Sequence, residues 1–170
     1  LVISDVRSRG DREAFLNART ATDRAIEAGN LAEARSRTRE AAEHARTQTQ
    51  WLQLIKRARN ISSTEERHLF LELTRTAVKS LPGNEHLWAL RVYAELRHGD
   101  AQRAAQLATE HLRSREYNSL RSEALLRSGK GPDAEPGGTG SEAGDTTHSA
   151  AETHSAAAGE ERRLLLVELS

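Results

Sequence analysis

Two pairs of glutamate and histidine have the spacing that places both side chains on one face of a helix. Glu65 and His68 form a Glu-x-x-His motif, which carboxylate-bridged di-iron bundles use twice, together with two further glutamates. The chain holds one such copy, and it lies at an expected first helical turn, where glutamate is favoured by the helix dipole. We therefore interpret Glu65 as a helix-start residue, and the similarly spaced Glu40 and His44 as a surface pair.

Other catalytic and metal-binding patterns are absent from the sequence. The chain has no cysteine, and it contains no His-Glu-x-x-His, no glycine-rich phosphate loop and no Gly-x-Ser-x-Gly. His148 and His154 recur in a short Thr-His-Ser-Ala-Ala duplication, which we interpret as low-complexity sequence, with a shared metal as the alternative. The sequence predicts a protein that is not an enzyme and that has no cofactor and no metal site.

Composition separates the chain into two parts of opposite charge. Residues 1–128 hold 22 basic and 17 acidic side chains, a net charge of +5, while the remainder restores the overall neutrality. No apolar run is long enough for a membrane span. Because the chain begins with Leu1 and has no methionine, we expect a mature form or a fragment, either cytoplasmic or exported or anchored by a missing upstream segment.

The C-terminal part lacks the residues that build a core. Residues 129–159 contain no leucine, isoleucine, valine or aromatic residue, and they are predicted to be a disordered low-complexity linker. Residues 160–170 return to an apolar pattern and are expected to be a short ordered segment, either the start of a truncated domain or a piece that docks back.

The first part of the chain has helical periodicity and predicts an all-α fold. Apolar residues recur every three or four positions, the first such stripe predicting a helix over about residues 11–28, with residues 1–10 as an N-terminal extension or the remnant of an upstream segment. About six or seven helices are expected in all. Whether the polar stretch 47–50 bends or breaks its helix stays open.

Turn signals and charge spacing add detail to this prediction. Gly29 with Asn30, residues 82–84 and His98 with Gly99 are predicted to end helices, and Asp100 is placed to cap the next one. Ion pairs three or four residues apart are predicted on the helix surfaces, namely Glu33 with Arg37, Glu72 with Arg75, and Glu123 with Arg127.

An internal spacing points to repeats. Gly29 and Gly99 are each followed by Asn or Asp and by an alanine five positions after the glycine, and a helix-start signal lies midway at residues 62–64. This spacing predicts three helical hairpins of about 34 residues. An irregular helical bundle is the alternative.

The hairpins resemble the tetratricopeptide repeat, most closely over residues 77–112. Residues 77–84 are similar to the end of one repeat, Trp88 stands where the next first helix commonly carries an aromatic, and Gly99 and Ala104 match its turn and second helix. Arg91 and Glu95 depart from the pattern, because the family tends to have apolar or aromatic residues there. The resemblance implies a short α-solenoid over residues 11–128 made of stacked antiparallel helical hairpins.

The resemblance also implies a function. The concave groove of such domains binds peptides, and the groove candidates here are Arg59, His86, Tyr93 and Arg97. Guanidinium groups pair with carboxylates, so we expect a protein scaffold for an acidic peptide or partner protein. The alternatives are a nucleic-acid-binding helical repeat, suggested by the arginine excess, and an assembly module of a larger chain. Self-association through a terminal hairpin is expected unless residues 115–128 cover that end.

Overall fold

The computed structural model describes residues 2–61 and 66–129 and is helical throughout them. The helices are α1 (Val2–Glu27), α2 (Leu31–His44), α3 (Gln48–Asn60), α4 (Glu66–Ser80), α5 (Glu85–His98), α6 (Ala101–His111) and α7 (Asn118–Arg127), with a short 3-10 turn, η1 (Arg115–Tyr117), before the last. No strand occurs among the described residues, so the predicted all-α class is confirmed there. The predicted linker after Gly129, the segment 160–170, Glu65 and the paired histidines 148 and 154 lie outside the described residues.

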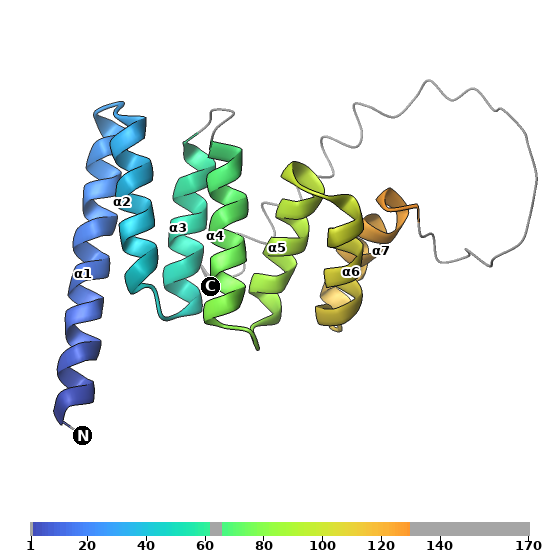
Figure 1. The fold of residues 1–170 in the computed structure, drawn as a ribbon, viewed down its shortest axis with the longest axis horizontal. Helices are drawn as coiled ribbons and strands as arrows, with labels where there is room; N and C mark the ends of the chain where they lie inside the picture. The colour runs from blue at the N-terminus through green and yellow to red at the C-terminus, as the bar shows by residue number, and fades with distance from the viewer. Residues whose placement is uncertain (1, 62–65, 130–170) are drawn as a thin grey trace, which may run out of the picture.

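Successive helices stand side by side in one row and alternate in direction (Figure 1). Each helix packs against the next one along the chain, and α7 also contacts α5. This order forms three antiparallel pairs, α1 with α2, α3 with α4, and α5 with α6, followed by α7. The pairing agrees with the predicted hairpins, while the assignment to the tetratricopeptide family stays a prediction.

Local capping explains where the helices begin. Gly29 adopts a left-handed conformation (φ +70°) after α1, and the Asn30 side chain accepts the N–H of Glu33 at the start of α2. Asp100 accepts the N–H of Gln102, so its predicted capping role is confirmed. The polar stretch breaks its helix: Thr47 caps α3 and exchanges hydrogen bonds with Gln50 in a capping box.

The first helix differs from its predicted extent. It begins at Val2 rather than near residue 11, and its N-terminal end extends past the end of α2 (Figure 1). Residues 6–10 are exposed. Apolar periodicity could not detect this extension, because a helical turn without a neighbour needs no buried stripe.

The core runs along the row of helices and is most complete around α5. Nine residues of this helix are buried, including Leu87, Leu90 and Val92, because α4, α6 and α7 surround it. On α6, three small side chains, Ala104, Ala105 and Ala108, are buried together with Leu107, and this helix packs against both α5 and α7.

Candidate functional site

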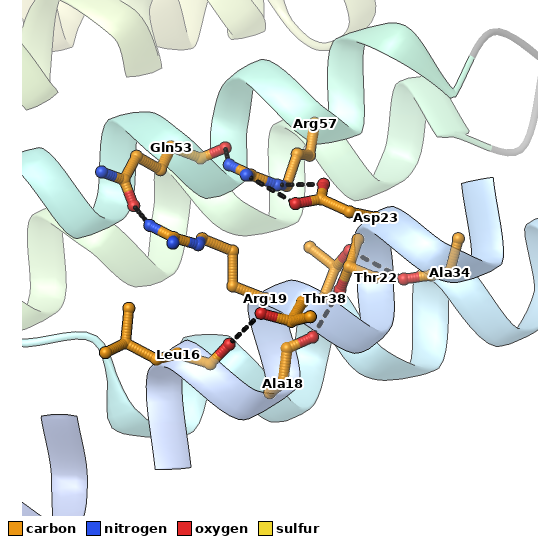
Figure 2. A network of polar contacts seen from close by, with 10 residues as sticks. Leu16, Ala18, Arg19, Thr22, Asp23, Ala34, Thr38, Gln53 and Arg57 are labelled. Atoms are coloured by element: carbon orange, nitrogen blue, oxygen red, sulfur yellow. Dashed lines mark hydrogen bonds and ion pairs between the residues drawn. The ribbon is translucent and has the colours of Figure 1, made fainter. Parts of the chain in front are cut away.

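Four polar side chains join the first helices of the first two pairs. Arg19 and Asp23 lie one turn apart on α1, and Gln53 and Arg57 lie one turn apart on α3, so that the two pairs face each other (Figure 2). We call these four residues the bridging cluster.

The bridging cluster is held by direct hydrogen bonds. Arg19 donates from Nη1 to Oε1 of Gln53 at 2.8 Å. Arg57 donates from Nε and Nη2 to the two carboxylate oxygens of Asp23, at 2.7 and 3.0 Å, and from Nη1 to the backbone oxygen of Gln53 at 3.0 Å. This bidentate geometry fixes the plane of the Arg57 guanidinium.

Buried threonines beside the cluster are satisfied within their own helices. Thr22 and Thr38 are fully buried, and their hydroxyls donate to the backbone oxygens of Ala18 and Ala34 at 3.0 and 2.7 Å (Figure 2). They leave no polar group that the cluster has to satisfy. Nε of Arg19 is buried without a hydrogen-bond partner among the described residues, so a ligand at the bridging cluster would have to meet the terminal Nη groups of this arginine.

The bridging cluster keeps an excess of positive charge at the surface. The side chains of Arg57 and Asp23 are 22% and 43% exposed, and Asp23 neutralises Arg57. Arg19 is half-buried and has a neutral amide as its side-chain partner, and none of the ion pairs among the described residues includes it. Lys56, half-buried on the same exposed side of α3, adds a second uncompensated cation.

The structure distributes the four predicted groove residues over two places. Arg59 is exposed near the end of α3. The other three lie on α5, where Tyr93 is 4% and His86 is 8% exposed. Neither ring can contribute more than an edge to a bound peptide.

Tyr93 and Arg97 are brought together. The Arg97 guanidinium lies over the Tyr93 ring, 5.3 Å from its centroid, and donates from Nη2 to Glu123 of α7 at 3.3 Å. Glu123 also accepts from Arg127 at 2.9 Å, as its spacing predicted. The Arg97 charge is thus largely compensated within the fold, by Glu123 and by the Tyr93 ring.

His86 is separate from that pair and supports the C-terminal end of the domain. Its Nδ1 lies 3.0 Å from the Tyr117 hydroxyl of η1, and its buried Nε2 has no hydrogen-bond partner among the described residues. The α5 face that carries the predicted groove residues is therefore covered in part by η1 and α7.

The two departures from the repeat pattern form one buried ionic cluster. Glu95 is fully buried, accepts from Arg75 at 2.9 Å and from the Asp100 N–H at 3.3 Å, and lies 4.0 Å from Nε of Arg91. Desolvation lowers the pKa of the Arg91 guanidinium, against the effect of Glu95. Because Glu95 is fully buried and also accepts the Asp100 N–H, this cluster stabilises the turn between α5 and α6.

The predicted pair of Glu72 with Arg75 is wrong, because both residues pair across helices. Arg75 reaches Glu95, where the low local dielectric strengthens the attraction, and Glu72 accepts from Arg39 of α2 at 3.2 Å. The predicted pair of Glu33 with Arg37 is confirmed at 2.7 Å. His44 contacts Asp11 of α1 rather than Glu40.

Neither a metal site nor a membrane span occurs among the described residues. No group of three or more histidine, aspartate or glutamate side chains there could hold a metal ion. None of the helices in the described part of the chain is long and apolar enough to cross a membrane.

Sequence reasoning missed the bridging cluster, although the signal was present in the repeat length itself. Arg19 with Gln53 and Asp23 with Arg57 are both 34 residues apart, close to the predicted length of a hairpin. Equivalent positions in stacked hairpins lie side by side, so complementary residues at that separation mark a contact. No protein-family model, curated protein or solved structure matches this chain.

Proposed function

We propose that the chain is a non-catalytic protein-interaction scaffold that binds an acidic segment of a partner protein at the bridging cluster. The observation that carries this proposal is Arg19, a cation held in place by the neutral Gln53 side chain with no carboxylate partner among the described residues. A preorganised guanidinium loses little conformational entropy when a carboxylate binds, and its fork of donors suits that ligand.

The surroundings of Arg19 support a negatively charged partner. Arg57 has the same fixed geometry and is already paired with Asp23, while Lys56 is unpaired in the described structure. A carboxylate at Arg19 would neutralise one of the two uncompensated charges of this face, as Asp23 does for Arg57, and a second acidic residue of the same segment could neutralise Lys56. The family resemblance implies a peptide-binding groove lined by the first helix of each hairpin, and the bridging cluster likewise lies on first helices, α1 and α3.

A protein partner is favoured over nucleic acid by the state of the aromatic rings. Five of the six aromatic side chains, Phe15, Trp51, Phe70, Tyr93 and Tyr117, are buried. The sixth, Trp88, is stacked on His111 with 3.5 Å between ring centroids. Single-stranded nucleic acids are bound largely by stacking on free rings, and this chain offers none in its bridging cluster.

Fluorescence anisotropy with a labelled octaglutamate peptide tests the proposal. The full chain is compared with Arg19→Gln and Lys56→Gln, and with Arg24→Gln, an exposed arginine of α1 that forms no ion pair among the described residues. We expect each of the first two variants to weaken binding about fivefold, because a partly exposed charge pair contributes about 1 kcal/mol. Arg24→Gln, which makes the same charge change, should leave the affinity within twofold of the native value.

Two results would overturn the proposal. Equal losses in all three variants would mean that the peptide responds to net charge alone. Tighter binding of a labelled single-stranded oligothymidylate than of octaglutamate, at about 150 mM salt where the Debye length is about 8 Å, would replace it with the nucleic-acid alternative.

A further inference from the structure

A basic pocket lies at the opposite half of α1 from Arg19. It has a volume of about 310 Å³ and is formed where the N-terminal half of α1 meets the connection between α2 and α3. Its lining residues are Arg7, Ser8, Asp11, Arg12, His44, Arg46, Thr47 and Gln50. The volume is at the lower end of the range of small-ligand pockets, which runs from about 300 to 1,000 Å³.

One carboxylate organises the cationic side of this pocket. Asp11 lies 3.2 Å from Nδ1 of His44 and 3.6 Å from Nη2 of Arg46. Arg46 also donates from Nη1 to the backbone oxygens of Glu43 and Ala45, each at 2.9 Å. The Arg46 guanidinium is therefore held in place before any ligand arrives.

The remaining arginines of the pocket are not neutralised. Arg7 and Arg12 line the pocket together with Asp11 of the same helix, are exposed, and take part in none of the ion pairs among the described residues. With three arginines and one aspartate, the lining carries a formal charge of +2 when His44 is neutral.

The attraction of this pocket for an anion comes from side chains and not from the backbone N–H groups at the start of α3. The backbone N–H groups of Arg46 and Thr47 both donate to Oε1 of Gln50, at 2.7 and 3.2 Å, and the Gln50 N–H donates to the Thr47 hydroxyl at 3.2 Å. These donors already have acceptors within the capping box. An anion in the pocket must be bound by the guanidinium groups.

We propose that this pocket binds a phosphomonoester. A phosphomonoester carries a charge of about −1.5 to −2 at neutral pH, which matches the +2 of the lining, whereas one carboxylate would leave half of that charge uncompensated. Its three terminal oxygens can accept from Arg7, Arg12 and Arg46 together. Clusters of arginine are the usual means of recognising phosphorylated side chains.

Titration of the full chain, followed by amide NMR shifts, tests this site. The probes are inorganic phosphate, a pentapeptide with a central phosphoserine, the same peptide without phosphate, and acetate at matched ionic strength. We expect saturable shifts at Ser8, Thr47 and Gln50 with both phosphate probes and none with the other two. The double variant Arg7→Gln, Arg12→Gln should weaken binding at least tenfold.

Arg9→Gln is the matched control, since Arg9 is exposed on the same helix but does not line the pocket. The site is refuted if neither phosphate probe saturates, if acetate produces the same shifts, or if Arg9→Gln weakens binding as much as the double variant. Tighter binding of the phosphopeptide than of inorganic phosphate would assign the site to phosphorylated proteins. Equal affinity would assign it to free phosphate compounds.

Discussion

Replacement of Glu95 by alanine should destabilise the domain strongly, because it separates two arginines from their common counter-ion. The two arginines differ in their access to water. The Arg75 side chain is 48% exposed and can rehydrate. The Arg91 side chain is 11% exposed, and its buried Nε has no hydrogen-bond partner among the described residues. Glu95→Ala therefore leaves Arg91 as a buried cation without a neighbouring anion.

The magnitude follows from that difference. Removal of one member of a buried ion pair costs about 3–5 kcal/mol. Since Arg75 escapes the penalty, we expect Glu95→Ala to lower the free energy of unfolding by about 3 kcal/mol, at the lower end of the range. For a domain of this size, such a loss lowers Tm by roughly 10 °C. The loss should change little with salt, because buried charges are poorly screened.

Urea unfolding followed by circular dichroism at 222 nm measures this loss, and a second variant identifies its cause. Arg91→Met keeps an unbranched apolar stem and removes the charge, so the double variant Glu95→Ala, Arg91→Met should be more stable than Glu95→Ala alone. Additive effects of the two substitutions, or a cost below about 1 kcal/mol for Glu95→Ala, would refute the reasoning.

Three further predictions concern the C-terminal half of the domain. Gly99→Ala should cost about 1–3 kcal/mol by urea unfolding, because a Cβ there would collide with the Glu95 carboxylate. Desolvation opposes ionisation of Glu85, but hydrogen bonds from Ser114 and Arg113 outweigh it and lower the pKa of Glu85. Glu85→Gln should thus lower Tm at neutral pH, and its difference from the native chain should vanish as the pH falls below about 4.3, through the folded-state pKa. Deletion of residues 115–128 should lower Tm and cause self-association in sedimentation velocity, because it uncovers the faces of α5 and α6 that pack on α7. A monomer with unchanged Tm would contradict this.

Much of the fold could be predicted because its signals are local. Asn30 and Asp100 cap helices that start immediately after them, and the apolar periodicity located the helices that have a buried face. The stretch 47–50 was ambiguous because Thr47 and Gln50 suit both a helix interior and a capping box. The capping box can be recognised only once the structure shows that α2 ends at His44 and that a new helix begins after Thr47.

The candidate site was harder to predict because charged side chains choose partners across helices. The spacing along one helix predicts that Arg75 pairs with Glu72, but the packing of α4 on α5 brings the buried Glu95 carboxylate to Arg75 instead. Burial likewise differs from the expectation for Tyr93. The repeat pattern places this residue in the groove, but its ring is buried, and α7 packs against α5. Tyr93→Ala would remove a buried ring and so alter stability as well as binding.

The helices contact one another in two ways, through apolar residues or through polar ones, and this difference explains where a ligand could bind. α5 packs on α4 and α6 through buried apolar residues, and the Glu95 carboxylate there is fully buried, although its partner Arg75 reaches water. α1 and α3 are joined by the bridging cluster, whose Arg57 and Asp23 remain in contact with water. A polar contact between helices that remains in contact with water keeps hydrogen-bond donors available to a ligand, whereas an apolar contact removes such donors from solvent. Substitution of Arg19 should therefore affect binding more than stability, and substitution of Glu95 should do the reverse.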